Sequence, residues 1–156
     1  MTSDEFARRI TAMTQTLYRI SRTMLASGAD REDAVAEAIR RAWEKRGSLR
    51  DERYVETWVV RILINVCRNV SRRRGREVPV ETLPERVAPQ GGDPDLRRAV
   101  TLLPENLRLP IVLHYTEGYE VAEIARMLRL PSGTVKTRMR KARALLKAML
   151  SEEVEP

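Results

Sequence analysis

Basic side chains gather on one predicted helix near the C-terminal end of the chain. From Ser132 to Leu150 the sequence holds six Lys or Arg residues and no Asp or Glu. At about 100° per residue, the helix has an apolar stripe of Val135, Met139, Ala142, Leu146 and Met149 and a basic stripe of Lys136, Arg140, Arg143 and Lys147. Because solvated helices usually mix charge signs, this self-repelling face predicts a polyanionic ligand. A solvated Lys/Arg-rich face is the simpler interpretation of the charge alone.

A second basic cluster lies in the middle of the chain, at the C-terminal end of another predicted helix. It consists of Arg68, Arg72, Arg73, Arg74 and Arg76. A helix C-terminus gains from about one positive charge, because the macrodipole is negative there. Five arginines are more than this stabilisation requires, so the cluster indicates a second binding surface. Simple stabilisation of the helix end is the alternative.

Residues that could carry out catalysis or hold a metal are scarce. The single cysteine, Cys67, has no disulfide partner, and the single histidine, His114, has no second histidine or thiol near it in the sequence. We interpret Cys67 as a small buried hydrophobe and His114 as a packed side chain. No Gly-rich phosphate loop and no Ser/His/Asp or Cys/His set is present. The sequence therefore predicts no enzyme, no metal, no cofactor and no small-molecule substrate.

The composition fits a nucleic-acid-binding protein in a reducing compartment. The 156 residues carry a formal net charge of +7 with a pI near 10.2, which suits a polyanionic partner. No apolar run approaches the roughly 18 residues of a membrane span. Charged residues stand near the N-terminus, where a signal peptide would be apolar. We therefore expect a cytoplasmic protein that is not embedded in a membrane.

The C-terminal basic helix is predicted to be the second helix of a helix-turn-helix. The first helix spans 120–128, with Ala125 as the small residue where the helices cross and meet Val135. Pro131 ends what precedes it, because its ring disfavours a helical residue before it. Ser132 is a favoured N-cap residue. The second helix would lie in the major groove, with residues near its N-terminus against base edges.

Two short helices, over 96–103 and 105–115, are predicted to precede the helix-turn-helix. Pro110 lies inside the second of them. Because proline has no amide hydrogen to donate, a kink is expected at that position.

Three amphipathic helices are predicted upstream, over 3–27, from Asp30 to a break at 47–50, and over 52–74. Their apolar residues recur at spacings of three and four, so each helix has one stripe to bury. Asp30 is expected to cap the second helix. Trp43 lies on the apolar stripe of the second helix and Trp58 on that of the third. Short links let three such stripes pack together as a bundle.

A proline-rich stretch separates the two helical parts. Residues 75–95 contain four of the eight prolines and three of the seven glycines, and their apolar residues show no helical periodicity. The predicted fold is all-α: an N-terminal three-helix bundle and a C-terminal helix-turn-helix domain, two small domains joined by a flexible linker. The predicted boundaries are 1–74 for the first domain, 75–95 for the linker, 96–150 for the second domain and 151–156 for a disordered tail.

Several stretches match a known pattern. In the C-terminal part they are Leu103-Pro104, Tyr119-Glu-Val-Ala-Glu-Ile-Ala125, Gly133-Thr-Val-Lys-Thr-Arg138 and Arg140-Lys-Ala-Arg143. In the N-terminal part they are Asp33-Ala-Val-Ala-Glu37 and Thr57-Trp-Val-Val-Arg-Ile-Leu-Ile-Asn65. With these motifs the chain resembles, over nearly its whole length, the bacterial sigma factors of the extracytoplasmic-function (ECF) group. They are the smallest members of the sigma-70 family, which directs RNA polymerase to promoters.

The resemblance implies that the N-terminal domain binds a coiled coil of the largest subunit of core RNA polymerase. The matching positions are Asp33, Glu37, Arg40 and Arg41. The family also recognises and opens the −10 promoter element with this domain. The loop around 48–53 would hold a flipped base through Ser48, Arg50 and Arg53. The helix facing the −10 DNA would be lined by Asn65, Arg68, Asn69, Arg72 and Arg73.

The resemblance further implies that the C-terminal domain reads the −35 element. The matching positions are Ser132, Thr134, Lys136, Thr137, Arg138, Arg140, Lys141 and Arg143, with Arg138 and Arg143 nearer phosphates. An anti-sigma factor is a further implied partner, and a bacterial cytoplasm the implied location. Three positions depart from the family pattern. Ala36 replaces a frequent glutamine, Asn69 stands where aspartate is common, and Arg129 occupies a turn position where glycine is frequent, so a left-handed non-glycine residue is expected there.

Two other classes of binding protein remain open on the residues alone. A free-standing helix-turn-helix transcriptional regulator would bind a palindromic operator as a dimer, without polymerase. A protein-interaction mimic would bind a sigma antagonist instead of DNA, although the basic residues on both predicted DNA faces argue against it. An enzyme is the class that the residues favour least.

Overall fold

The computed structural model describes residues 1–77, here the N-terminal half, and 92–154, here the C-terminal half. Every regular element in these two ranges is a helix, so the predicted all-α class with two helical domains is confirmed. Most of the predicted linker falls on residues 78–91, which lie outside the described residues, as do 155–156. Within the described ranges, no helix is both long enough and apolar enough to cross a membrane.

The first predicted helix is divided into α1 (Ser3–Ala12) and α2 (Thr14–Met24). The division falls at Met13, whose amide donates to the Ile10 carbonyl at 3.0 Å in a tightened turn. A single helix over 3–27 was therefore wrong. The apolar stripe nevertheless continues across the division, because the backbone of Met13 stays near-helical (φ −89°, ψ −6°) and its side chain is buried.

The second helix, α3 (Gly28–Glu44), begins before the predicted cap. Its N-cap is Ser27, whose hydroxyl accepts from the Asp30 amide at 3.3 Å, so the prediction of Asp30 as the cap was wrong. The Asp30 carboxylate instead forms an ion pair with Arg74 at 2.8 Å. Arg74 lies near the C-terminal end of the longest helix of the N-terminal half. Two 3₁₀ turns and that longest helix follow: η1 (Arg46–Ser48), η2 (Glu52–Tyr54) and α4 (Val55–Glu77).

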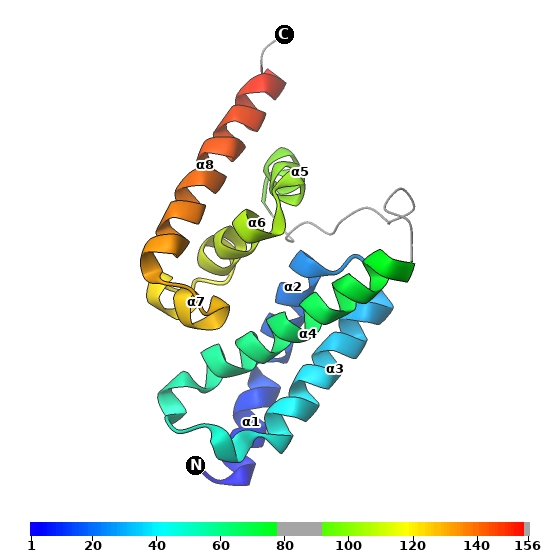
Figure 1. Cartoon of the computed structure of the whole chain (residues 1–156), viewed down its shortest axis with the longest axis vertical. Helices are drawn as coiled ribbons and strands as arrows, with labels where there is room; N and C mark the ends of the chain where they lie inside the picture. Colours follow the sequence, from blue (N-terminus) through cyan, green and yellow to red (C-terminus); the bar gives the residue numbers. More distant parts are fainter. Residues whose placement is uncertain (78–91, 155–156) are drawn as a thin grey trace.

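Helices α2, α3 and α4 lie side by side as a bundle (Figure 1). The largest side chains that are fully buried between them include Leu17, Ile20, Val35, Leu63 and Ile64. Trp58 is half-buried against this core, as expected. Trp43 is 41% exposed, so its predicted burial was wrong. The Trp43 ring centroid lies 6.1 Å from that of the buried Phe6 ring, and the guanidinium carbon of Arg46 lies 3.9 Å from the Trp43 centroid.

The C-terminal half is built from α5 (Pro94–Leu102), α6 (Glu105–Ile111), the π-helical turn η4 (Val112–Thr116), α7 (Val121–Leu128) and α8 (Ser132–Val154). The wider turn η4 comes directly after Pro110 of α6. Because Pro110 donates no amide hydrogen bond, the regular helical ladder is interrupted near it, and the irregularity expected at this proline takes the form of a π turn.

Helices α7 and α8 form the predicted helix-turn-helix. Arg129 is left-handed (φ 55°), as expected from the departure at this position, and the Leu130 amide after it donates to the Ala125 carbonyl at 2.9 Å. This hydrogen bond closes the end of α7 in the way that glycine usually permits. Ile124 of α7 and Val135 of α8 are fully buried in the crossing.

Helix α8 differs from the prediction at both ends. The Pro131 carbonyl accepts from the amides of Thr134 and Val135, so Ser132 is the first helical residue and not the cap. The helix then continues to Val154, beyond the predicted end near Leu150, and the first residues of the predicted tail are helical.

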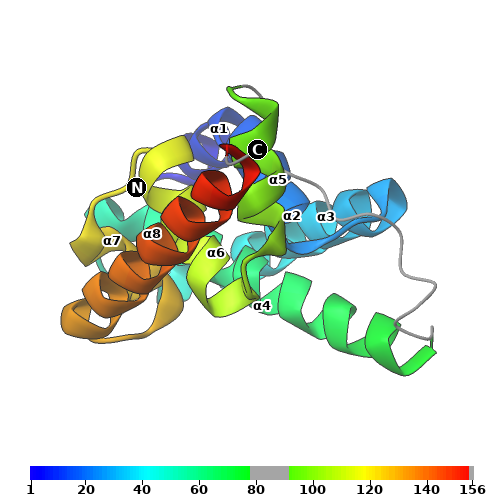
Figure 2. The same cartoon turned by 90° about the horizontal axis from the view of Figure 1, so that it is seen from above.

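The two halves pack against one another. The main contact is between α4 and α7, and a second joins α2 to α6. Seen from above, the C-terminal half lies over the N-terminal bundle (Figure 2), and α8 lies at its outer edge, away from α3 (Figure 1). The buried apolar residues of both halves belong to one continuous cluster. The predicted domains therefore touch directly in this structure.

Candidate nucleic-acid interface

The basic face of α8 is free of the core. Lys136, Arg140, Lys141 and Arg143 are exposed, while Val135, Met139 and Ala142 on the opposite stripe are buried. The helix therefore presents its cations outward because its apolar stripe packs on α5, α6 and α7. An exposed row of cations on a helix of this kind suits phosphate and base contacts in a DNA groove.

The remaining predicted residues of α8 lie near its first two turns. Ser132 and Thr137 are exposed, and the Thr137 hydroxyl donates to the Gly133 carbonyl at 2.9 Å. Thr134 and Arg138 are half-buried. Further along α8, the Arg143 side chain donates to the hydroxyl of Tyr115 in η4 at 3.3 Å. This hydrogen bond orients the Arg143 guanidinium group. The eight predicted positions thus share one helix, and most of them are open to a ligand.

A second polar face runs along α4. Asn65, Asn69, Arg72 and Arg73 are exposed, and Arg72 donates to the Asn69 side-chain oxygen at 2.8 Å. Arg68 is different. It is half-buried, and its Nε donates to Glu105 of α6 at 3.1 Å. One member of the predicted set is therefore engaged by the C-terminal half.

The predicted base-binding loop lies between η1 and α4. The Ser48 hydroxyl donates to the Lys45 carbonyl at 2.7 Å, and Arg53 pairs with Asp51 at 2.7 Å, which holds the pKa of the Asp51 carboxyl below its usual value. Arg50 is exposed. Of the three predicted loop residues, Ser48 and Arg50 border a cavity of about 480 Å³ and Arg53 does not. The cavity is lined by Ser48, Leu49, Arg50, Asp51, Tyr54, Thr57, Trp58, Arg61, Arg126 and Arg129.

Three arginines of the cavity lining were not predicted as site residues. Arg61 comes from α4, whereas Arg126 and Arg129 come from α7 and its turn. Burial and the nearby charge of Arg129 lower the pKa of Arg61. No local pattern could have placed Arg61 beside Arg126 and Arg129, because they meet only through the packing of α4 on α7.

The predicted polymerase-binding residues share the α3 surface. Glu37 accepts from Arg40 at 2.6 Å and from Arg41 at 2.8 Å, and Arg40 also reaches Glu44 at 2.6 Å. The hydrogen bonds from Arg40 and then Arg41 lower the pKa of Glu37 to about 2. Asp33 is exposed one turn away. The structure thus brings the four predicted residues together on one charged surface, where Glu37 pairs with Arg40 and Arg41.

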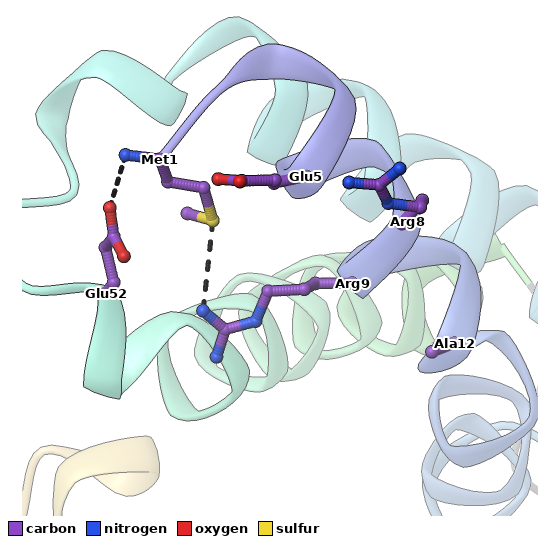
Figure 3. A pocket seen from close by; sticks show the side chains of 6 residues that line it. All are labelled: Met1, Glu5, Arg8, Arg9, Ala12 and Glu52. Carbon is purple, nitrogen blue, oxygen red and sulfur yellow. Dashed lines mark hydrogen bonds and ion pairs between the residues drawn. The ribbon is translucent and has the colours of Figure 1, made fainter.

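The N-terminus contacts the segment around residues 48–53, which contains the predicted base-binding loop. The α-amino group of Met1 pairs with Glu52 of η2, and Arg9 reaches the Met1 sulfur at 3.8 Å (Figure 3). The pKa of this amino group is raised by its hydrogen bond with Glu52. A cavity of about 390 Å³ opens beside them. This contact ties α1 to the segment that carries Arg53.

Cys67 and His114 have structural surroundings. Cys67 is buried, and burial, together with Glu105, raises the pKa of its thiol to about 12. The Nδ1 atom of His114 lies 2.8 Å from the Tyr119 carbonyl oxygen. In the described ranges no three His, Cys, Asp or Glu side chains are grouped so that they could hold a metal ion.

Both halves match regions of one family of transcription proteins. The description "Sigma-70 region 2" matches residues 10–77, and "Sigma-70, region 4" matches residues 94–146. Among curated relatives, the ECF RNA polymerase sigma factor SigM of Mycobacterium tuberculosis is 33% identical over 139 residues, which cover 86% of this chain and 71% of SigM. The ECF RNA polymerase sigma-E factor of Escherichia coli is 31% identical over 134 residues, which cover 73% of this chain and 70% of that factor.

Solved structures share the fold. The sigma factor RpoE of Bartonella quintana, in complex with the anti-sigma factor NepR, aligns with a TM-score of 0.79 at 23% identity, covering 97% of this chain and 99% of RpoE. CnrH, in complex with the cytosolic domain of CnrY, aligns with a TM-score of 0.71 at 23% identity, covering 97% of this chain and 90% of CnrH.

Because two sigma-70 regions match in order, the alternative of a free-standing regulator is not favoured.

Proposed function

Since the chain belongs to the ECF group of RNA polymerase sigma factors, we propose that it binds core polymerase and promoter DNA through the surfaces described above. The N-terminal domain, residues 1–74, is assigned to polymerase binding and to recognition and melting of the −10 element. Residues 75–95 are assigned to the linker, and residues 96–150 to recognition of the −35 element.

The observation that carries this assignment is the pair of exposed polar faces on α4 and α8. One presents Asn65, Asn69, Arg72 and Arg73, and the other presents Lys136, Arg140 and Lys141. Phosphate contacts by such cations supply affinity, and base-edge contacts supply discrimination. When two weakly binding DNA surfaces belong to one chain, binding of the first raises the effective concentration of the second, so the overall affinity for DNA increases.

The individual roles are proposed from the family resemblance, and the exposure of most of these side chains supports them. Lys136, Thr137, Arg140 and Lys141 are assigned to base edges of the −35 element, and Arg138 and Arg143, together with Ser132 and Thr134, to the surrounding backbone. The loop residues Ser48, Arg50 and Arg53 are assigned to a flipped −10 base, whose unstacking costs a few kcal/mol that the loop must offset. Asn65, Arg68, Asn69, Arg72 and Arg73 are assigned to the adjacent strand.

The partners are proteins and DNA. The charged α3 surface of Asp33, Glu37, Arg40 and Arg41 is assigned to a coiled coil of the largest polymerase subunit. Two relatives of known structure were solved with an anti-sigma factor or a cytosolic partner domain, and we propose that an anti-sigma factor also binds this chain. The protein then acts in the bacterial cytoplasm as a binding subunit, with no catalytic step of its own.

Run-off transcription with core polymerase tests the proposal. Genomic fragments are transcribed with core alone, with core and this protein, and with core and the Arg140→Ala variant. Start sites that appear only with the wild-type protein, and weaken with the variant, support promoter recognition. Identical transcripts with and without the protein would contradict it.

A further inference from the structure

The cavity of about 480 Å³ beside the 48–53 loop lies where the two halves of the chain meet. Its volume falls within the range of roughly 300–1,000 Å³ that small-molecule sites occupy. Four arginines line it: Arg50, Arg61, Arg126 and Arg129. Among the described residues of the lining, Asp51 is the one carboxylate, and it is already paired with Arg53 at 2.7 Å. The lining therefore holds an excess of positive charge.

Most of these arginines are not neutralised by the protein itself. Within residues 1–77 and 92–154, the guanidinium groups of Arg50, Arg61 and Arg129 form no hydrogen bond and no ion pair. Arg61 is half-buried, and burial, together with the like charge of Arg129, lowers its pKa. Two positive charges held close together repel one another, and a cation withdrawn from water loses hydration. An anion bound between them would relieve both effects.

The fourth arginine is oriented by an aromatic ring. The guanidinium carbon of Arg126 lies 3.8 Å from the Tyr54 ring centroid. Stacking uses the flat face of a guanidinium group and leaves the N–H donors at its edge available to acceptors. The half-buried ring of Trp58 also lines the cavity. Arginine donors beside aromatic rings can bind the phosphates and the base of a nucleotide.

The backbone at Arg129 is an independent indication of a binding role. Arg129 is left-handed, with φ 55°, a conformation that strains a residue with a Cβ atom and does not strain glycine. Strained residues gather at ligand-binding sites, where the surrounding structure holds them in place. The turn thus presents an arginine to the cavity at a position where glycine would fit without strain.

We propose that this cavity binds an oligophosphate, a chain of linked phosphate groups that is either free in solution or carried by a nucleoside. Arg61 and Arg129 bind phosphate oxygens, because the planar guanidinium fork matches the geometry of a phosphate group. Since Arg61 belongs to the N-terminal half and Arg129 to the C-terminal half, one bound oligophosphate contacts both halves. The site goes beyond the proposed function, because Arg61, Arg126 and Arg129 carry no assigned DNA contact.

The test titrates the full chain with inorganic tripolyphosphate in a calorimeter, at constant ionic strength and without magnesium. The site variants are Arg61→Gln and Arg129→Gln, and the second keeps the Cβ atom of the left-handed residue. The matched control, Arg140→Gln, removes the same charge from the exposed basic face of α8. The urea midpoint without ligand verifies that each variant folds. Because Arg129 is exposed, Arg129→Gln keeps the test decisive even if Arg61→Gln does not fold.

The wild-type chain is expected to bind one tripolyphosphate. Each site variant is expected to bind it at least about tenfold more weakly, because a charge-assisted contact to a phosphate is lost. Arg140→Gln is expected to keep the wild-type affinity. An equal loss in Arg140→Gln and Arg129→Gln would show diffuse attraction to a cationic surface and overturns the proposal. An affinity that neither site variant changes overturns it as well.

Adenosine triphosphate and adenosine, titrated in the same way, distinguish the two sources of the oligophosphate. Tighter binding of the nucleotide than of tripolyphosphate identifies a nucleotide whose base contacts the aromatic rings, whereas equal affinity identifies the free oligophosphate. Both results support the site when Arg129→Gln weakens the binding of both ligands. Binding of adenosine that matches the binding of adenosine triphosphate overturns the proposal, because the phosphates would then contribute nothing.

Discussion

The guanidinium carbon of Arg126, on the first helix of the helix-turn-helix, lies 3.8 Å from the ring centroid of Tyr54, at the end of the 48–53 loop. Arg53 lies over the same ring at 5.6 Å. The tyrosine is thus shared between a cation of its own half and a cation of the other half. A cation held this way at an exposed site contributes roughly 0.5–1 kcal/mol.

A double-mutant cycle measures this coupling. Tyr54→Leu and Arg126→Gln, alone and together, are compared in urea unfolding, and a coupling free energy of about 0.5–1 kcal/mol is expected. Arg53→Gln with Tyr54→Leu is the matched comparison, and it is expected to couple more weakly because Arg53 lies farther from the ring. Strictly additive effects of Tyr54 and Arg126 would show that the stacking stabilises nothing.

Arg140→Ala is expected to relax −35 selectivity. Loss of a base-edge contact costs about 1–3 kcal/mol of discrimination between sequences. Transcription from a panel of promoters with single −35 substitutions measures it. Arg143→Ala, in contrast, is expected to weaken all sequences evenly and to lower the salt slope by about 0.9. Equal loss of selectivity in both variants would contradict the assigned roles.

Leu63→Ala in the middle of α4 is expected to destabilise the chain. Leu63 is fully buried, and a leucine removed from a core costs about 2–5 kcal/mol, because transfer energy is lost and a cavity remains. Leu102→Ala is the control, since Leu102 is 65% exposed and its truncation is expected to cost less than about 0.5 kcal/mol. Urea midpoints compare the two, and similar midpoints would contradict the packing described.

Arg129→Gly is expected to stabilise the helix-turn-helix. Arg129 is left-handed (φ 55°), a conformation that costs a residue with a Cβ atom about 1 kcal/mol and costs glycine little. Arg129→Ala removes the same charge and keeps the Cβ, so it isolates the backbone effect. Higher unfolding temperature in the glycine variant than in the alanine variant is the expected result, and the reverse order would contradict it.

The carboxyl group of Glu37 is expected to stay ionised in moderately acidic solution. Hydrogen bonds from Arg40 and Arg41 lower its pKa to about 2, from an ordinary value of 4.5. A depressed folded-state pKa means that this ion-pair contribution is complete above about pH 4.5 and is lost as the pH falls through 2. An NMR titration of the Glu37 side-chain carbon measures the midpoint, and Arg40→Gln is expected to raise it. A wild-type midpoint near 4.5 would contradict the pairing.

The helical stripes could be predicted because helix periodicity is local. Val135 and Met139 are buried and Lys136 and Arg140 exposed, as the spacing indicated. Helix ends were predicted less well. Ser27 and Asp30 are both good caps within three residues of one another, and only packing decides which is used.

Contacts between the halves could not be predicted from the sequence. Arg68 was assigned to the DNA-facing side of α4 from the family resemblance, but its partner, Glu105, lies 37 residues away. Trp43 followed an apolar stripe, yet it is 41% exposed, with Arg46 over its ring. Such pairings depend on how the two halves pack, and no local pattern encodes them.

The end of α4 at Glu77 and the start of α5 at Pro94 are 17 residue steps apart along the chain. A fully extended backbone spans at most ~3.5 Å per residue, so the helix ends can separate by ~60 Å before a helix must unravel. At 3.4 Å per base pair, that reach equals roughly 17 base pairs of duplex. The covalent chain therefore limits how far apart the end of α4 and the start of α5 can lie while both helices stay folded.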